Sequence, residues 1–406
     1  MDVHRDFAQL AVVEDGQLSD AGQIACRPEG LRAWAETLRP DDEVALEATG
    51  NTEAIVALIK PRVARVVVSN PMKTRAIAEA KVKTDKVDAR ILAQLLAADF
   101  LPPVWLPDDR TRALRRIIAR RTHLVRQRTR LKNQVHAILA RNLMPRPPVS
   151  DLFGDRGRRW LARQDLPEDE HRLVGALLRQ LDFHGDELAE VDLDLARAAL
   201  GDPVVRRLMT VPGIDSVIAV SILAAVGDFS RFASADKLVC YFGLNPQVRQ
   251  SGGQVASHGR ITKAGRAQAR GMVEAAWVAS RTPGPLRAFY QRIKSRRGLQ
   301  IAIVATARKM TALCWHLIAN QQDYAFARPS LVAFKERKLE LRAGAPRTIA
   351  KRGKGYDYNN KELRRHEREI VEQQERAYAV LAAHWEPHGP APAGPRDHRQ
   401  RAESAG

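Results

Sequence analysis

The sequence predicts a mixed α/β domain, then two long helical arms, then a mostly helical C-terminal region. Short apolar runs alternate with helical stretches over residues 1–105, which is typical of a mixed α/β sheet. A continuous helical pattern covers residues 108–142, and helical patterns dominate residues 203–322. We therefore expect four parts: an α/β domain at 1–105, coiled-coil arms at 106–202, a helical domain at 203–325, and a basic helical extension with a disordered tail at 326–406.

The α/β domain is expected to open with a β-hairpin. Residues 10–13 are apolar, and Glu14-Asp15-Gly16-Gln17 follows them as a hairpin turn signal. Further strands are expected at 43–48 and 64–69. Helices are expected at residues 28–39, 51–60 and 71–81.

The chain is strongly basic. Lys and Arg outnumber Asp and Glu by 66 to 47, which gives a net charge of +19. Such a surplus usually indicates a polyanionic partner, most commonly nucleic acid. A basic protein without such a partner stays an alternative. Aromatic residues make up only 5% of the chain, which argues against a large stacking platform for bases.

Cysteine usage and hydropathy favour a protein of the cytoplasm. The three cysteines lie far apart without metal-binding spacing, which fits a reducing compartment. The start of the chain is polar and does not have the pattern of a signal peptide. The longest apolar run, residues 217–226, is shorter than the roughly 20 residues of a membrane span, so no membrane partner is expected.

The first arm is basic and the second is acidic. Apolar residues recur at alternating steps of three and four from Leu114 to Ile138, with Arg121 and Arg128 in two of the same positions, which predicts an interrupted coiled coil. Residues 110–146 hold twelve Arg or Lys and no acid. We therefore expect this arm to contact phosphates, through Arg115, Arg121, Arg128 and Lys132. A basic arm without a ligand is the alternative. The acid-rich arm at 168–200 is expected to pair antiparallel with the first arm or across a dimer.

Four carboxylates fall at the ends of elements in the α/β domain. Asp2 lies in the first strand, and Glu47 ends the second clear strand. Asp85 and Asp88 open a helix and share one face with a stripe of leucines. Unpaired anions against a core are costly, so a cation must offset them. Hard oxygen ligands suit Mg²⁺ or Mn²⁺, and two such ions can stabilise a phosphodiester reaction. Any one of these acids alone is more often a solvated surface charge.

The motifs around these acids resemble a known family. They are Asp2-Val3-His4-Arg5, Glu47-Ala48-Thr49-Gly50 and Lys83-Thr84-Asp85-Lys86-Val87-Asp88-Ala89. They look like the DEDD, RuvC-like domain of insertion-sequence family 110 transposases, a family that includes Piv-type DNA invertases. The resemblance implies an RNase H-like fold with Asp2, Glu47, Asp85 and Asp88 as catalytic metal ligands. Members of this family have several residues before the first Asp, so we expect a shortened first strand here or a start further upstream.

A helix-hairpin-helix pattern opens the C-terminal region. Residues 208–216 place Pro212 and Gly213 between two apolar helices. Amides at the second helix would bind a phosphate near Gly213 without reading bases. A plain helix connection is the alternative. Further on, Ser251-Gly252-Gly253 lies in a stretch of sequence that is rich in Arg and Lys. Four of these basic residues are expected to contact nucleic acid: Arg260, Lys263, Arg266 and Arg270. By residue chemistry alone this serine segment is more often a turn.

The second motif set resembles the same family. Gly243-Leu244-Asn245-Pro246, Ser251-Gly252-Gly253 and Gly259-Arg260-Ile261-Thr262-Lys263-Ala264-Gly265 look like its C-terminal transposase domain. There the serine of the Ser-Gly pair is the nucleophile, so the resemblance implies that Ser251 is catalytic. The resemblance covers about residues 1–325, and the two motif sets occur in the same order as in the family.

The expected function is therefore excision and insertion of an insertion sequence. The resemblance implies metal-assisted cleavage of double-stranded DNA at the element ends and target, with a transient phosphoserine link. It also implies a noncoding guide (bridge) RNA and a homo-oligomer, dimer to tetramer, in which one protomer's carboxylates meet another's serine. We expect the protein to associate with the nucleoid. The alternatives are a Piv-type site-specific invertase, a metal-dependent junction nuclease without a covalent step, and a binding or assembly protein without chemistry.

Overall fold

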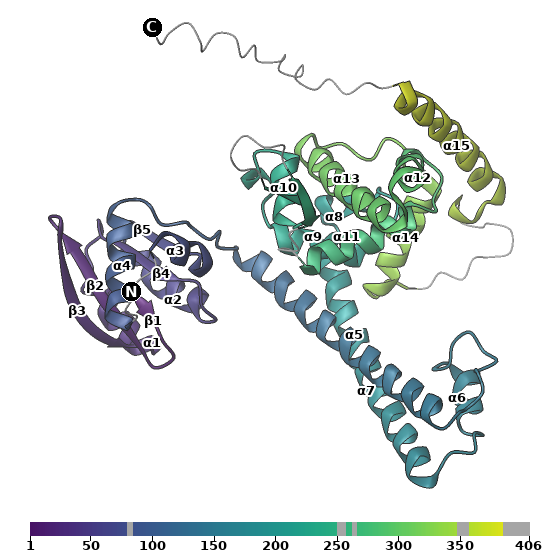
Figure 1. The fold of residues 1–406 in the computed structure, drawn as a ribbon, viewed down its shortest axis with the longest axis horizontal. Helices are drawn as coiled ribbons and strands as arrows, with labels where there is room; N and C mark the ends of the chain where they lie inside the picture. The colour runs from purple at the N-terminus through teal and green to yellow at the C-terminus, as the bar shows by residue number, and fades with distance from the viewer. Residues whose placement is uncertain (79–83, 250–256, 262–265, 347–356, 385–406) are drawn as a thin grey trace, which may run out of the picture. The chain divides into compact units, whose positions relative to one another are not determined.

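The computed structural model describes residues 1–78, 84–249, 257–261, 266–346 and 357–384. The chain divides into two compact units, Met1–Asp108 and Asp109–Gly406 (Figure 1). The boundary falls in the short segment after the last helix of the α/β region. The predicted arms therefore belong to the same unit as the helical region that follows them.

The N-terminal unit is built on two groups of strands. β1 (Asp2–Val3), β2 (Phe7–Glu14) and β3 (Gln17–Ala25) form an antiparallel sheet, whereas β4 (Glu43–Glu47) and β5 (Arg65–Ser69) pair in parallel. The predicted hairpin is confirmed, because Glu14 pairs with Gln17 across a two-residue turn. Both turn residues have positive φ, 50° at Asp15 and 78° at Gly16, as such turns require.

Helices cover both faces of these strands. The unit contains α1 (Pro28–Ala35), α2 (Thr52–Ile59), η1 (Lys60–Arg62), α3 (Pro71–Ile77) and α4 (Asp85–Ala97). On one face, Leu31 of α1 and Ile55 of α2 share a core with Val3 and Leu46. On the other face, Leu92 of α4 packs against Ala45 and Val67. The predicted mixed α/β region is thus confirmed. The first helix is shorter than the expected 28–39, and α3 ends at Ile77, before the undescribed residues 79–83.

The two arms pair antiparallel within one chain. α5 (Asp109–Arg141) and α7 (Glu168–Ala199) lie side by side, and α6 (Asp155–Leu161) lies in the connection between them. Leu131 and Val135 of α5 share a buried cluster with Leu177 and Leu181 of α7. Of the two pairings expected, the intrachain one is therefore present. The finer prediction of coiled-coil geometry stays a prediction.

Opposite charges face each other along the arms. Arg121 Nε lies 2.6 Å from Asp192 Oδ1, and Arg141 Nε lies 2.7 Å from Glu170 Oε1. Arg120 forms a further ion pair with Glu187. Since these pairs are at least partly solvent-exposed, each contributes little to stability. Together they explain why a helix without internal acids pairs with one rich in acids.

The rest of the second unit is mostly helical. Its elements are α8 (Pro203–Met209), α9 (Ser216–Val226), η2 (Phe229–Arg231), α10 (Ala235–Tyr241), β6 (Pro246–Arg249), β7 (Ser257–Ile261), α11 (Arg266–Ala279), α12 (Pro285–Arg297), α13 (Leu299–Ala319), α14 (Pro329–Arg342), η3 (Asp357–Asn359) and α15 (Lys361–His384). α13 is long and apolar enough to cross a membrane, as judged by length and composition alone. Its residues Ala302, Ala307 and Met310 are buried in the core of this unit, which is the position of a core helix.

The predicted Pro212-Gly213 turn lies between α8 and α9, and the helix-hairpin-helix motif itself stays a prediction. Gly213 has a φ of 86°, and a Cβ atom there would lie 2.2 Å from the carbonyl oxygen of Ala275 in α11. The glycine therefore permits close packing of the turn on α11. From α14, the Lys335 ammonium donates to the carbonyls of Met209, Val211 and Ile214 at 2.6, 2.9 and 2.9 Å. Lys335 thus ties the turn to the C-terminal extension.

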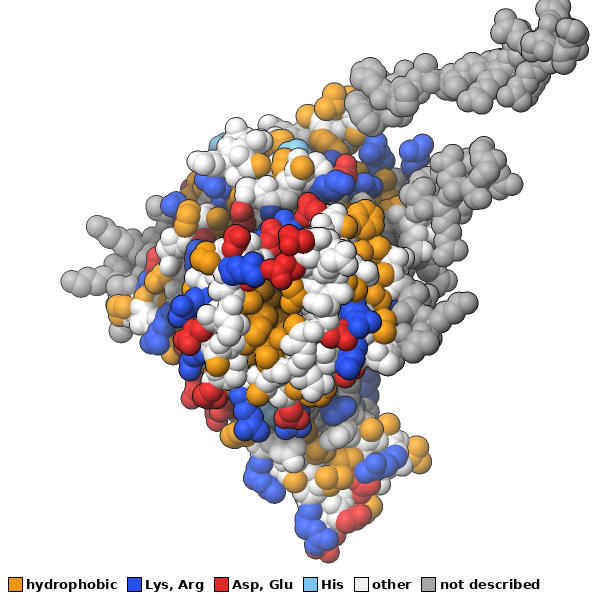
Figure 2. Space-filling view, turned by 90° about the vertical axis from the view of Figure 1, so that its left-hand side faces the viewer, with side chains coloured by type: hydrophobic (Ala, Val, Ile, Leu, Met, Phe, Trp, Pro, Cys, Tyr) orange, Lys and Arg blue, Asp and Glu red, His pale blue; other side chains and the backbone are white. Residues whose placement is uncertain are grey.

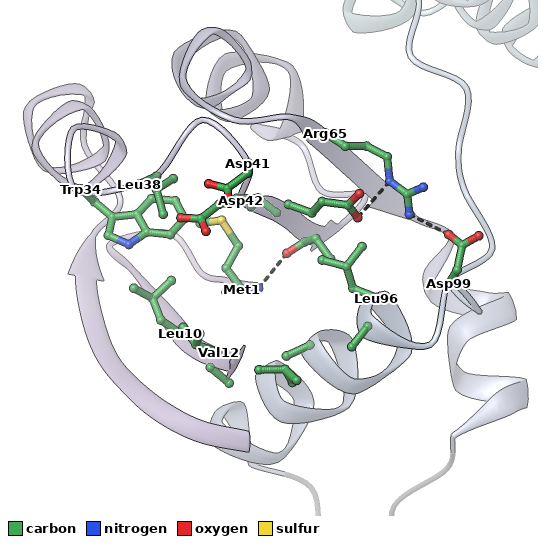
Figure 3. A pocket seen from close by; sticks show the side chains of 17 residues that line it. Met1, Leu10, Val12, Trp34, Leu38, Asp41, Asp42, Arg65, Leu96 and Asp99 are labelled. Atoms are coloured by element: carbon green, nitrogen blue, oxygen red, sulfur yellow. Dashed lines mark hydrogen bonds and ion pairs between the residues drawn. The ribbon is translucent and has the colours of Figure 1, made fainter. Parts of the chain in front are cut away.

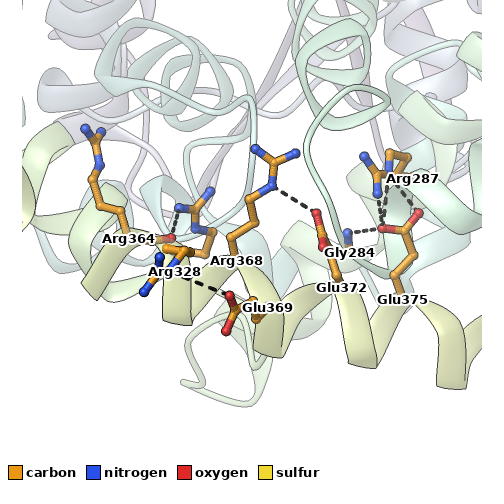
Figure 4. Close-up of polar contacts among 9 residues, drawn as sticks. Gly284, Arg287, Arg328, Arg364, Arg368, Glu369, Glu372 and Glu375 are labelled. Atoms are coloured by element: carbon orange, nitrogen blue, oxygen red, sulfur yellow. Dashed lines mark hydrogen bonds and ion pairs between the residues drawn. The ribbon is translucent and has the colours of Figure 1, made fainter. Parts of the chain in front are cut away.

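Two glutamates hold α15 against the rest of the unit, and Figure 4 shows one of them, Glu375, beside Gly284 and Arg287. Glu375 accepts from the backbone N–H of Gly284, at the N-terminus of α12, and from the Arg287 guanidinium at 2.7 Å. Glu367 is 7% exposed and accepts from the backbone N–H of Ser330, in the first turn of α14. Each carboxylate therefore satisfies an N–H that its helix leaves unpaired.

Candidate metal centre

β1 and the turn after it position Asp2 and His4. β1 pairs with β2 through Asp2 opposite Gln9 and Val3 opposite Ala8. The backbone N–H of His4 donates to the Phe7 carbonyl at 2.9 Å, and the two rings stack with centroids 4.8 Å apart. Because Val3 faces the α1–α2 core and side chains alternate along a strand, Asp2 points to the α4 side.

The N-terminus of α4 brings further carboxylates. Thr84 caps this helix by accepting from the Val87 N–H, so Asp85 and Asp88 lie in the first turn. The unpaired N–H groups and the dipole at this end stabilise negative charge. The N-terminus of α4 can therefore accommodate the carboxylates of Asp85 and Asp88 beside the half-buried carboxylate of Asp2.

Three side chains converge at one point. His4 Nε2 lies 3.1 Å from Asp2 Oδ2 and 3.4 Å from Asp85 Oδ1. One ligand atom from each of the three residues lies within 4.8 Å of the other two, close enough to hold a metal ion. The Asp2 side chain is only 16% exposed, compared with 47% for Asp85, so Asp2 is the least exposed of the three.

The electrostatics of Asp2 reflect this arrangement. Burial raises the pKa of Asp2 above its ordinary value, and the carboxylates of Asp88 and Asp85 raise it further, whereas His4 opposes the rise. Concentrated negative charge in a partly buried site favours a bound cation. Asp88 contributes to the raised pKa of Asp2 and so lies near it. It is not one of the three residues whose ligand atoms lie within 4.8 Å of one another.

Glu47 also lies on this side of the sheet. It is the last residue of β4 and is half-buried. It shares a strand face with Ala45, which packs against Leu92 of α4, one turn after Asp88. Among the described residues, the group within ligand distance comprises Asp2, His4 and Asp85, and Glu47 is not in it. The metal role of all four predicted acids stays a prediction.

His4 had no role in the sequence-based prediction. It stood inside the first motif, two residues after Asp2, and that spacing was the available signal. Only the turn between β1 and β2 aims its Nε2 at both carboxylates. Its imidazole would orient the two acids or add a nitrogen ligand.

The predicted nucleic-acid contacts on α5 have partners inside the chain. Arg115 Nε donates to the Ala224 carbonyl at 2.9 Å, and Arg121 pairs with Asp192. Arg128 Nη1 lies 3.5 Å from the Leu181 carbonyl oxygen, and Lys132 Nζ lies 4.9 Å from the centre of the Phe153 ring. These contacts give the four residues structural roles, and their binding to nucleic acid stays a prediction.

The C-terminal candidates are only partly described. Ser251 and Lys263 lie outside the described residues. Arg260 lies in β7, the antiparallel partner of β6, and Arg266 begins α11. Arg270 is exposed and pairs with Glu274 at 3.0 Å.

Comparison with known proteins identifies the family. The family described as "Transposase IS116/IS110/IS902 family" matches residues 205–291, and the DEDD transposase domain of IS110 elements matches residues 1–144. The chain belongs to this transposase family. Its N-terminal unit is accordingly a RuvC-like DEDD domain. The two matches occur in the order expected from the motifs.

Relatives of this transposase are similar over most of their length. The y4qE protein of Sinorhizobium fredii, named as a transposase, is 29% identical over 285 residues, 68% of this chain and 70% of the relative. The transposase of element IS1111A from Coxiella burnetii is 23% identical, covering 60% of this chain and 68% of its own. The pilin gene-inverting protein of Moraxella bovis is 27% identical, covering 64% and 74%.

Divalent cations are expected to stabilise this transposase in a pH-dependent way. MgCl₂ or MnCl₂ should raise the midpoint of thermal unfolding by several degrees at pH 7.5 and by less at pH 5. Because the folded-state pKa of Asp2 is raised, its stabilising contribution is present at acid pH and is lost as pH rises through that pKa. A cation restores the loss, and protons compete with it. Differential scanning fluorimetry measures the shift, and an equal effect of KCl at matched ionic strength would contradict this assignment.

Proposed function

We propose that the protein is a DNA transposase that excises and inserts an insertion sequence by metal-assisted strand cleavage and exchange. The observation that carries this proposal is the convergence of Asp2, His4 and Asp85 within a DEDD transposase domain. Family membership supports DNA recombination as the activity. The site of action is proposed to be the bacterial nucleoid.

The donor set fits a divalent cation. Asp2, Glu47, Asp85 and Asp88 would hold Mg²⁺ or Mn²⁺, with Asp2 anchored by β1 and Asp85 by the first turn of α4. Bound there, the cation would stabilise negative charge that develops at a phosphodiester. His4 would hold the Asp2 and Asp85 carboxylates in fixed positions relative to each other through its Nε2 contacts.

Ser251 would supply the nucleophile. Its hydroxyl oxygen forms a bond to phosphorus while one P–O bond of the DNA strand breaks, and the leaving oxygen takes up a proton. The product is a phosphoserine ester, and a second DNA hydroxyl reverses the step to complete strand exchange. The proposal assigns the serine and the acids of one active site to different protomers, in a dimer or tetramer.

The partners are double-stranded DNA and a noncoding guide RNA. The net charge of +19 supports a polyanionic partner. On α5, Arg116, Arg126 and Arg130 are exposed and add phosphate-binding candidates to the predicted ones. A guide RNA would supply sequence recognition that a phosphate-binding surface cannot.

A Piv-type invertase is the second candidate. The similarity to the pilin gene-inverting protein of Moraxella bovis favours it, because the same chemistry would act on a fixed locus. A metal-dependent junction nuclease would need no serine. The transposase and invertase reactions would therefore depend on Ser251, whereas the junction nuclease reaction would not.

The serine is tested by Ser251→Ala, with Ser257→Ala as a matched control. We expect Ser251→Ala to abolish cleavage of element-end DNA and to leave the cation-induced thermal shift unchanged. A covalent protein–DNA adduct should form with wild type and with Ser257→Ala, and should be absent with Ser251→Ala. Cleavage that persists in Ser251→Ala would favour the junction nuclease.

A further inference from the structure

A cleft lined by arginines lies between α12 and α15 in the second unit. It is a cavity of about 1210 Å³, larger than the roughly 300–1,000 Å³ of a typical small-molecule pocket. Three arginines of α12 and one of α15 line it: Arg287, Arg292, Arg296 and Arg376. The cleft therefore has room for an extended ligand and carries positive charge.

The packing of the two helices explains why this space exists. At one end, Val371 of α15 is 4% exposed, and a Cβ atom on Gly284, just before α12, would lie 3.1 Å from its Cγ1. Further along, the residues that line the space are small on both helices: Ala288 of α12, and Ala379, Ala382 and Ala383 of α15. Such short side chains do not fill the space between two helices, so a cleft remains.

The acids of the cleft are already used inside the protein. Glu372 and Glu375 each accept from an arginine, at 2.9 and 2.7 Å (Figure 4). In the part of the chain that the structure describes, Arg296 and Arg376 line the cleft, are exposed and form no ion pair. The charge of these two arginines is therefore available to an anionic ligand.

Helix stabilisation accounts for only part of this charge. The last turn of α12 carries Lys294, Arg296 and Arg297, whereas the negative end of a helix dipole amounts to about half a charge. Residues 275–322 hold eight Arg or Lys and no acid. Among the described residues, the buried Nε of Arg292 has no hydrogen-bond partner. This excess of cationic donors indicates a polyanionic partner.

An aromatic ring adds a second kind of contact. Tyr378 of α15 lines the cleft, and Lys309 Nζ of α13 lies 5.9 Å from the centre of its ring. The bases of a single strand can stack on such a ring, whereas the bases of a duplex are already stacked on one another. A ring among cations is therefore suited to a single strand.

The cavity of the N-terminal unit has a different character (Figure 3). It has a volume of about 580 Å³, and Asp41, Asp42, Glu43 and Asp99 line it. Arg65 in the same lining pairs with Glu43 at 3.2 Å and with Asp99 at 2.7 Å. Figure 2 shows a face of the molecule on which charged side chains of both signs surround a hollow with an apolar floor. Because acids repel a phosphate, the α12–α15 cleft is better suited to a polyanion than this cavity.

We propose that the cleft between α12 and α15 binds a single-stranded stretch of nucleic acid, with phosphates at Arg296 and Arg376 and a base stacked on Tyr378. α15 lies beyond the residues that either family matches, so this site is separate from the metal centre and from Ser251. The choice of nucleic acid over a small anion rests on the proposed function, whereas the positive charge of the cleft does not.

The test changes the cleft in the full-length chain and measures binding by fluorescence anisotropy in EDTA. The probes are labelled single strands of about 12 nucleotides, oligo-dT and oligo-U. Replacing both arginines, Arg296→Gln with Arg376→Gln, should weaken binding about tenfold and lower the slope of log Kd against log salt by about 1.4, because each phosphate of a single strand contributes about 0.7. Tyr378→Leu should weaken binding about tenfold with an unchanged slope, because stacking releases no counterions.

A matched control removes two charges from α15 outside the cleft, by Lys361→Gln with Arg365→Gln. Both residues are exposed. Arg365 lies about 16 Å along the helix from Arg376, beyond the Debye length of about 10 Å at 0.1 M salt. The affinity of this control should therefore change by less than about twofold.

Three outcomes would overturn the proposal. The first is unchanged affinity in the cleft variants, and changed self-association in light scattering would then assign the cleft to a protein partner. The second is an equal loss in the control. The third is displacement of the strand by inorganic phosphate at constant ionic strength, which would assign the cleft to a small anion. Loss with either probe supports the proposal, and the tighter probe identifies the strand as DNA or RNA.

The same experiment keeps the cleft and the proposed reaction apart. Binding is measured without divalent ions, so a negative result leaves the metal centre and Ser251 untouched. Conversely, cleavage that persists in Ser251→Ala would remove the serine from the reaction and would leave the cleft as a binding site.

Discussion

Replacing Asp85 with asparagine is expected to reduce DNA strand cleavage by about 10³-fold or more, because metal stabilisation of a phosphoryl transition state supplies several kcal/mol. A side-chain amide at this position cannot carry the negative charge that Asp85 places 3.4 Å from His4 Nε2. The rise in unfolding midpoint with Mg²⁺ or Mn²⁺ should disappear as well. Cleavage is measured on end-labelled element DNA, and cation binding by calorimetry.

Asp15→Asn is the matched control for this variant. Asp15 lies at the exposed tip of the β2–β3 turn with a φ of 50°, a conformation that asparagine tolerates. It should cleave DNA and respond to cations as wild type does. Full activity of Asp85→Asn would remove Asp85 from the site, whereas loss of cation response in both variants would indicate an indirect effect of net charge.

The sequence was most informative where one local pattern determines one local structure. The turn between β2 and β3 follows from Asp15-Gly16, because few other residue pairs accept two positive φ values. The long helix α5 follows from its apolar repeat and was predicted within one residue at each end. The convergence of Asp2 with Asp85 could be anticipated through the motifs of the family.

Contacts between distant segments were less predictable. The basic charge of α5 indicated phosphates, but part of it faces Glu170, Glu187 and Asp192 of α7. A run of residues with charge of one sign indicates a partner of the opposite charge. It does not say whether that partner is nucleic acid or another helix. His4 was missed for a related reason, because its role depends on the β1–β2 turn aiming a ring at a helix that is distant in the sequence.

Lys335→Met is expected to destabilise the second unit by about 3 kcal/mol, the largest effect on stability that we predict. Methionine fills a similar volume but cannot donate, so the carbonyls of Met209, Val211 and Ile214 lose their shared partner. Burial lowers the pKa of Lys335 to about 8, an effect that Asp215 opposes, so most of the amine is still charged at neutral pH. Chemical denaturation followed by far-UV circular dichroism measures the loss.

Lys338→Met separates this contact from a general loss of charge on α14. Lys338 lies on the same helix and is exposed, so its replacement should change stability by less than about 0.5 kcal/mol. If both variants unfold alike, the Lys335 ammonium is not what holds the α8–α9 turn. If only Lys335→Met is destabilised, the extension beyond the matched family region is part of the fold that positions this turn, because the ammonium that closes the turn comes from α14.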